Sequence, residues 1–153
     1  MITGGAESAD TITAPAPGGS GAVACIELAL ADAGLSAADI RQINAHGTST
    51  PLNDAAEAEA VEKVFGTPGP PMTSLKGVTG HALGGAGALE GVSVLLSFEK
   101  GLIPPTAGTT EVDPGIAADV VLGEARPWEP GPTISNSFGF GGHNGTVIIA
   151  PPG

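Results

Sequence analysis

The feature that most constrains this chain is a glycine-rich segment that follows Lys76 and leads directly into a long apolar run. Glycine destabilises a helix interior by about 1 kcal/mol relative to alanine, so the glycines of this segment need a structural reason. We expect another part of the backbone to approach closely at each of them. They are Gly84, Gly85, Gly87 and Gly91.

The apolar run from Leu89 to Phe98 predicts a helix that is buried on all sides, because hydrophobic residues occupy nearly every position. Glu90 is a lone carboxylate among these apolar residues. A buried carboxylate requires a partner, and Lys76 is the obvious candidate. Lys76, His81 and Glu90 therefore form a predicted polar cluster.

Hydrophobic periodicity along the rest of the chain predicts alternating strands and helices, with residues 1–17 ending a strand and entering a loop. Ser36 is expected to cap a short turn through Asp39. The expected helices are Gly19 to Ala33 and Leu52 to Phe65, and the expected strands are Arg41 to Ala45, Met72 to Leu75, Asp119 to Leu122, Thr133 to Ser137 and Gly145 to Ala150. This alternation favours a single α/β domain over residues 1–153, with a mixed, mostly parallel sheet covered by helices.

His46 and His81 each lie beside a glycine in a loop that follows an expected strand. If those strands are parallel, both loops meet at the same end of the sheet. Three interpretations of the histidines are then open. They satisfy backbone groups of their loops, they bind zinc as a pair, or they converge on an oxygen atom of a substrate. The zinc alternative lacks a His-Glu-x-x-His motif and a third ligand at short spacing, whereas two imidazoles facing one oxygen would stabilise an oxyanion or enolate.

Charge and composition restrict the partners of the chain. A formal net charge of −11 argues against binding to nucleic acid or to an anionic membrane. The chain has no leader pattern and no apolar run of about 18 residues, so we expect a soluble, cytoplasmic protein. The single cysteine, Cys25, excludes an internal disulfide and lies within an expected helix, which favours a packed thiol over a nucleophile.

Three segments, in this order, resemble the C-terminal signatures of the β-ketoacyl-[acyl carrier protein] synthases, and most closely those of the type II elongating enzymes of fatty acid biosynthesis. The match extends over nearly the whole chain. At position 77 this chain has glycine where the family usually has serine after the lysine, and we expect this difference to have little effect. The segments are Asn44-Ala45-His46-Gly47-Thr48-Ser49-Thr50-Pro51, Lys76-Gly77-Val78-Thr79-Gly80-His81 and Asn136-Ser137-Phe138-Gly139-Phe140-Gly141-Gly142-His143-Asn144.

The resemblance implies a thiolase-like fold of which this chain is the C-terminal half, with the nucleophilic cysteine in an absent N-terminal half. It implies an acyltransferase that carries out decarboxylative Claisen condensation of an acyl-enzyme with malonyl-acyl carrier protein. His46 and His81 would bind the malonyl thioester carbonyl, supported by the Lys76–Glu90 ion pair. This chain alone would be inactive, because Cys25 does not match the nucleophile.

The resemblance also assigns binding roles. Thr48 and Thr50 would hold the phosphopantetheine arm of the carrier protein, Gly139 would contact substrate, and Phe140 would gate the site and complete an oxyanion hole with its N–H. No covalently bound cofactor is implied. A structural K⁺ or Na⁺ would be held by a set of polar residues, namely Asn44, Glu57, Ser135 and Asn144.

The expected partners are acyl carrier protein, the N-terminal half of the synthase and, in the complete enzyme, a second copy as a homodimer. Two alternatives remain open from the sequence. One is a non-catalytic partner subunit similar to the chain-length factors of polyketide systems, although those lose the catalytic residues that this chain keeps. The other is an inactive truncated fragment.

Overall fold

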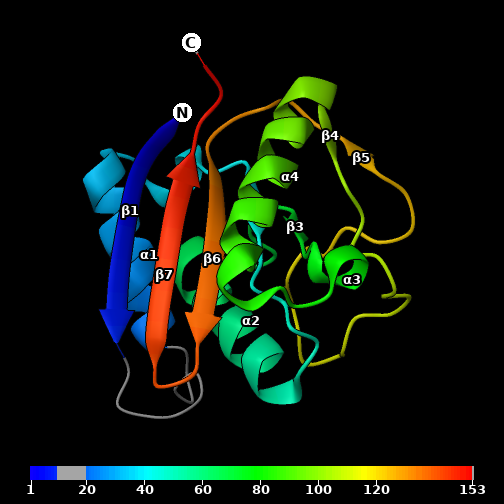
Figure 1. The fold of residues 1–153 in the computed structure, drawn as a ribbon, viewed down its shortest axis with the longest axis horizontal. Helices are drawn as coiled ribbons and strands as arrows, with labels where there is room; N and C mark the ends of the chain where they lie inside the picture. The colour runs from blue at the N-terminus through cyan, green and yellow to red at the C-terminus, as the bar shows by residue number, and fades with distance from the viewer. Residues whose placement is uncertain (10–19, 153) are drawn as a thin grey trace.

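The computed structural model describes residues 1–9 and 20–152, which form a layered α/β structure around a mixed sheet (Figure 1). Two expectations lie outside the described residues. They are the loop at the end of residues 1–17 and Gly19, the first residue of the first expected helix. In spatial order, the strands of the main sheet are β1 (Ile2–Ala9), β7 (His143–Ile149), β6 (Thr133–Gly139), β2 (Gln42–Asn44) and β3 (Met72–Thr73).

The directions of the strands confirm a mixed sheet but not a mostly parallel one, because two of its four strand pairs are parallel and two are antiparallel. Strand β2 pairs in parallel with both β3 and β6, whereas β7 runs antiparallel to β6 and to β1. Strand β7 therefore runs opposite to the other four strands of this sheet. The parallel arrangement of β2 and β3 places the loops that follow them at the same end of the sheet.

Helices cover both faces of the sheet. Helix α1 (Ser20–Ala33) and helix α2 (Pro51–Phe65) pack on one face, and helix α4 (Ala86–Lys100) lies across the other (Figure 1). The core between α1 and the sheet contains Ile26, Ala29, Leu30, Ile40, Ile134 and Ile148, and the core between α2 and β2 contains Ile43, Ala45, Val61 and Met72. These inward positions follow the periodicity expected from the sequence.

Local sequence signals set most helix boundaries. A proline opens α2, and Gly66 and Gly101, both with positive φ, follow the last residues of α2 and α4. The turn η1 (Ala37–Asp39) is held by Asp39, whose carboxylate accepts bonds from the Ser36 hydroxyl and N–H. Two short elements, α3 (Lys76–Thr79) and η2 (Leu83–Gly85), connect β3 to α4.

Several predicted boundaries were wrong. Only a single bridge between Val120 and Met72 forms in the predicted strand 119–122, whereas β4 (Leu102–Ile103) and β5 (Arg126–Pro127), which were not predicted, pair with each other. Both are two residues long, too short for a visible alternation. The hairpin of β6 and β7 is longer than expected, since only residues 140–142 form its turn.

Helix α4 differs from the prediction of burial on every side. Its buried residues are Ala86, Glu90, Val94 and Ser97, whereas Leu89, Val92, Leu95 and Leu96 are between 42% and 55% exposed. The close backbone approach expected at its glycines is also absent among the described residues, because a Cβ atom added at any of them would meet no atom nearer than 3.8 Å. An apolar sequence predicts that a face will be covered, but not which chain covers it.

No helix in the described part of the chain combines the length and the hydrophobicity needed to cross a lipid bilayer.

Candidate active site

The two histidines meet at one end of the sheet. His46 follows β2, and His81 lies between α3 and η2; their ring centroids are 5.3 Å apart and the rings are nearly perpendicular. His46 is buried, whereas His81 is exposed and its Nδ1 accepts a hydrogen bond from the N–H of Leu83 at 3.2 Å. The predicted convergence of the two histidine loops is therefore present in the structure.

The electrostatic setting keeps His46 uncharged. Burial lowers the pKa of His46 to about 3, and the nearby charges of Lys76 and His81 act in the same direction. At neutral pH its imidazole therefore carries one N–H and can donate a hydrogen bond without bearing a net charge. The Nδ1 atom of His46 is buried and has no hydrogen-bond partner among the described residues.

Lys76 and Glu90 form the predicted ion pair. The Lys76 ammonium lies 2.5 Å from Oε1 of Glu90, and the exposed fractions of the two side chains are 5% and 2%. Lys76 opens α3 and Glu90 lies in the first turns of α4, so the pair joins the two elements that flank His81. The position of Lys76 next to His46 also contributes to the low pKa of that histidine.

Glu57 holds the backbone of the His46 loop. Its carboxylate accepts the N–H of His46 and the N–H of Gly47, both at 2.9 Å, and a bond from the Asn136 amide at 3.3 Å. Burial raises the pKa of the Glu57 carboxyl, and these same hydrogen bonds oppose that shift. Asn136, which was not predicted as a site residue, thus connects strand β6 to the histidine loop.

The residues predicted to hold a monovalent cation come from four elements, namely β2, α2, β6 and β7. Asn44 and Ser135 are cross-strand neighbours joined by a 3.2 Å hydrogen bond. Glu57 instead bonds Asn136, the residue after Ser135 in β6, and successive side chains of a strand point to opposite faces. Asn144 donates to the carbonyl of Gly142. The Oδ1 atom of Asn44 is buried and has no hydrogen-bond partner among the described residues, and a K⁺ or Na⁺ at this set stays a prediction.

Among the described residues, no group of three or more His, Cys, Asp or Glu side chains is placed to hold a metal ion.

Phe138 contacts His46, whereas Phe140 was the phenylalanine expected beside the histidines. The ring centroids of His46 and Phe138 are 5.8 Å apart. Phe140 lies in the turn that follows Gly139 at the end of β6, and it is 91% exposed. The end of β6 explains the difference, because Phe138 lies within the strand whereas Phe140 comes after its last residue, Gly139, in the turn.

Thr48 and Thr50 lie where the His46 loop enters α2. Their hydroxyl oxygens are 2.9 Å apart, and Thr50 is the residue that precedes the helix. Ser49 between them has a φ of 62°, a left-handed conformation that is uncommon outside glycine. The two hydroxyls therefore project as a pair at the rim of the site.

Cys25 is fully buried in α1, and its thiol donates to the carbonyl of Ala6 at 3.2 Å. This confirms the prediction of a packed thiol.

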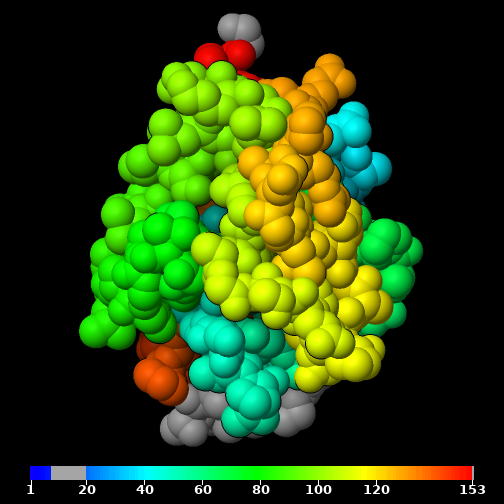
Figure 2. All heavy atoms as spheres, turned by 90° about the vertical axis from the view of Figure 1, so that its right-hand side faces the viewer, coloured from blue at the N-terminus to red at the C-terminus, as the bar shows by residue number. Residues whose placement is uncertain are grey.

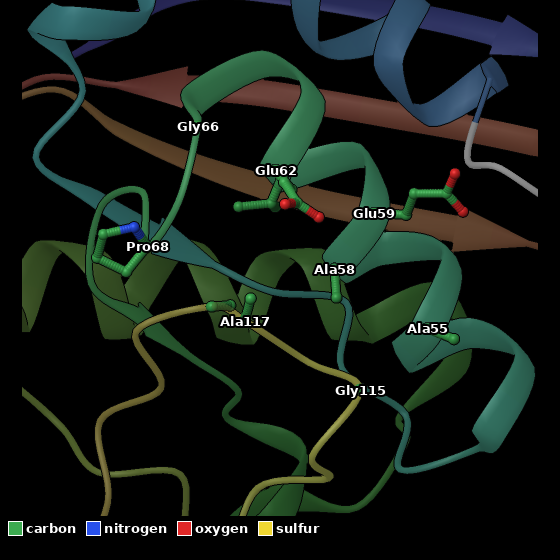
Figure 3. Close-up of a pocket in the computed structure, with 10 residues that line it drawn as sticks. Ala55, Ala58, Glu59, Glu62, Gly66, Pro68, Gly115 and Ala117 are labelled. Atoms are coloured by element: carbon green, nitrogen blue, oxygen red, sulfur yellow. The ribbon is translucent and has the colours of Figure 1, made fainter.

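Two hollows border α2. One, of about 270 Å³, is lined by Ala45, Gly47 and Ser74 of the histidine region together with Thr106 and Thr109. The other, of about 290 Å³, lies between α2 and residues 115–118 and is shown in Figure 3. Its walls are mainly the small side chains of residues such as Ala55, Ala58 and Ala117, and neither histidine contributes to it. Neither histidine lines the first hollow either, but Gly47 and Glu57 do, so that hollow adjoins the His46 loop.

Comparison with known proteins gives a consistent result. Residues 1–110 match the family described as "Beta-ketoacyl synthase, C-terminal domain". A 3-oxoacyl-[acyl-carrier-protein] synthase 2 of a Synechocystis species is 43% identical over 140 residues, which cover 90% of this chain and 34% of the relative. The chain therefore spans about a third of the length of that relative.

Solved structures agree in fold. The ishigamide ketosynthase/chain length factor has a TM-score of 0.94 and 36% identity, with 99% of this chain and 38% of the other covered. A structure described as a type II polyketide acyl-carrier protein in complex with its ketosynthase, AntDE:AntF, has a TM-score of 0.93 and 31% identity, with 99% and 38% covered.

Proposed function

The chain belongs to the β-ketoacyl synthase family, as its C-terminal domain, and from this we propose that it supplies the histidine pair for decarboxylative Claisen condensation. The substrates would be an acyl group held as a thioester on a cysteine and malonyl-acyl carrier protein. Loss of CO₂ from the malonyl group leaves an enolate. The enolate carbon then attacks the acyl thioester carbonyl, forming a carbon–carbon bond and releasing the cysteine thiolate.

The observation that carries this proposal is the convergence of His46 and His81, with ring centroids 5.3 Å apart. During decarboxylation, negative charge develops on the thioester oxygen, and two N–H donors aimed at that oxygen lower the barrier. The low pKa of His46 supports this role, because a neutral imidazole donates without adding positive charge to a buried site. Lys76, fixed by Glu90, helps to maintain that neutral state.

The rim residues have a binding role in this proposal. Thr48 and Thr50 would hydrogen-bond the phosphopantetheine arm, supported by the placement of their hydroxyls at the start of α2. Phe140 would act as a gate together with Gly139, since a ring that is 91% exposed at a hairpin turn is able to move. The pathway that these features fit is fatty acid biosynthesis.

The nucleophilic cysteine would come from an N-terminal part of the synthase, because Cys25 is fully buried and bonded to the carbonyl of Ala6. The exposed apolar residues of α4 would pack against that part. Acyl carrier protein is the proposed second partner, supported by the carrier-protein complex among the solved neighbours. We further propose that the complete synthase is a homodimer and that this chain alone does not condense substrates.

The test uses the complete synthase that contains this domain. Replacing His46 or His81 by alanine removes one donor to the enolate and is expected to slow malonyl-carrier-protein decarboxylation about 10²- to 10³-fold. Acylation of the cysteine should be less affected. The matched control is His143→Ala, since His143 is the third histidine of the chain and is exposed at the start of β7.

Unchanged decarboxylation in both variants would reject the proposed role. It would instead favour the non-catalytic partner subunit. The chain keeps both histidines and the lysine, so the catalytic function is the better supported of the two.

A further inference from the structure

We propose that Ser74 is the positioning residue that fixes the two histidine loops relative to each other. This inference rests on the proposed role of the histidine pair and extends it to a residue that does not touch that pair. Ser74 directly follows β3 and is buried, with an exposed fraction of 7%.

The hydroxyl of Ser74 connects the two loops. It donates to the carbonyl oxygen of Gly47, the residue after His46, at 2.9 Å. It also accepts the N–H of Lys76, the first residue of the segment that leads to His81, at 3.4 Å. One side chain therefore joins the end of the β2 loop to the start of the β3 loop.

The contact at Gly47 leaves no room for a side chain. Gly47 has a φ of 43°, and a Cβ atom there would lie 2.6 Å from Cβ and 2.7 Å from Oγ of Ser74. Glycine is thus required at this position for its conformation and for the close approach of Ser74. Since Glu57 binds the N–H of Gly47 and Ser74 binds its carbonyl, both ends of this residue are fixed.

A third segment also holds Ser74, through its backbone. The N–H of Ser74 donates to the hydroxyl oxygen of Thr106 at 3.2 Å. Thr106 belongs to the segment after β4, which is yellow-green in Figure 2 and lies against the green region of α3 on the molecular surface. Ser74 is therefore held from its backbone while its side chain holds the loops.

The physical consequence concerns geometry and not charge. Two donors stabilise one oxygen only if their separation is preserved, and a small displacement of either removes much of the benefit. Without the Ser74 hydroxyl, the Gly47 carbonyl loses its protein partner and the His46 loop can move away from His81. His46 should then become more accessible.

The first test uses the 153-residue chain and does not depend on enzymatic activity. Carbethoxylation of each histidine by diethyl pyrocarbonate is followed by mass spectrometry, with exposed His143 as the internal reference. In Ser74→Ala we expect the rate at His46 to rise about fivefold, the factor that corresponds to the loss of one net hydrogen bond. The control is Ser97→Ala, since Ser97 is also buried and its hydroxyl donates to the Ser93 carbonyl within α4.

The second test measures the complete synthase. Ser74→Ala should lower kcat for malonyl decarboxylation by a similar factor and leave cysteine acylation and the KM for malonyl-carrier protein near the values of the Ser97→Ala control. If Ser74→Ala does not fold, Thr106→Val, which removes the acceptor for the Ser74 N–H and the 3.5 Å bond from the Thr106 hydroxyl to Thr73, should shift both readouts in the same direction.

The outcomes separate this inference from the proposed function. A rate at His46 in Ser74→Ala equal to that in Ser97→Ala overturns the positioning role. Increased reactivity of His46 in a synthase whose wild type does not decarboxylate malonyl-carrier protein would support the positioning role and reject the proposed function.

Discussion

At the residue scale, Gly77 shows how one missing side chain affects packing. The family resemblance places serine here, and little effect was expected from the change. In the structure, however, a Cβ atom at Gly77 would overlap the carbonyl oxygen of Ala107. The obstacle is backbone, so the 106–109 segment would have to move.

We therefore predict that Gly77→Ser destabilises this chain by about 1–3 kcal/mol, the usual cost of overpacking. Urea unfolding followed by circular dichroism measures the difference. Gly84→Ser is the matched control, because a Cβ atom there has no neighbour within 4 Å. Equal stability of the two variants would show that the 106–109 segment adapts without cost.

The low pKa of His46 leads to a separate prediction about how the free energy of unfolding depends on pH. Its pKa of about 3 in the folded state lies below its ordinary value of 6.5, mainly because of burial. As the pH falls from 6.5 towards 3, the unfolded chain takes up a proton that the folded chain does not, so the free energy of unfolding should decrease. His46→Gln should reduce this dependence.

The comparison between wild type and His46→Gln removes the effect of other groups. The pKa of Glu57 is raised by burial, which makes a contribution of the opposite sign, but Glu57 is present in both proteins. Urea unfolding curves between pH 4 and pH 7 give the two slopes. Identical slopes would mean that His46 is protonated in the folded state, contrary to its neutral role.

At the element scale, the Lys76–Glu90 pair connects α3 to α4 through buried charges. Lys76→Ala leaves Glu90 uncompensated and should cost about 3–5 kcal/mol of stability, whereas replacing both residues by apolar ones should recover much of that loss. Thermal and urea unfolding of Lys76→Ala and of the double variant Lys76→Met/Glu90→Leu provide the measurement.

The exposed pair Lys63–Glu59 in α2 is the control, with side chains 49% and 46% exposed. Surface pairs of this kind contribute about 0–1 kcal/mol, so Glu59→Ala should have little effect. A loss in Lys76→Ala no larger than that of Glu59→Ala would contradict a structural role for the buried pair.

The same elements indicate what the sequence could and could not predict. The ion pair was predictable, because a single carboxylate in an apolar run needs a charged partner and Lys76 lies shortly before it. The meeting of the histidine loops was also predictable, from two parallel strands that end beside each other. In contrast, the bond from Asn136 to Glu57 joins residues 79 positions apart, and sequence periodicity carries no information about such contacts.

The contact of Phe138 with His46 was not predicted, for a related reason. Phe138 and Phe140 are two positions apart in a glycine-rich motif, and the sequence does not show where the strand ends and the turn begins. The glycines that other atoms approach closely were also predicted at the wrong positions. A Cβ atom added at Gly47 or Gly77 would overlap its neighbours, whereas one added at the glycines of the α4 segment would not. Close approach depends on the loop opposite, which local sequence does not describe.

At the scale of the whole molecule, the exposed apolar face of α4 should govern association. Leu89, Val92 and Leu96 recur at helical spacing on that face, and each is at least 42% exposed. An apolar face of this kind favours self-association of the isolated chain. We predict that Val92→Glu/Leu96→Glu lowers both self-association and binding of a hydrophobic dye without reducing the urea midpoint.

Sedimentation velocity and dye fluorescence test this prediction. Leu52→Glu is the control for added negative charge, because Leu52 is 71% exposed on α2, on the other side of the sheet. If Leu52→Glu reduces association as much as the α4 variant does, general charge repulsion and not the α4 face is responsible.

The pairing of β1 with β7 has a consequence for how the chain is made. These two strands are neighbours in the sheet, and the N–H of Ala150 even donates to the carbonyl of Met1 at 2.8 Å. A ribosome releases β1 well before β7, so β1 lacks its β7 partner while the residues between them are synthesised. During that interval its free edge is open to pairing with other nascent chains. Translation speed over this segment should therefore influence how much protein folds correctly.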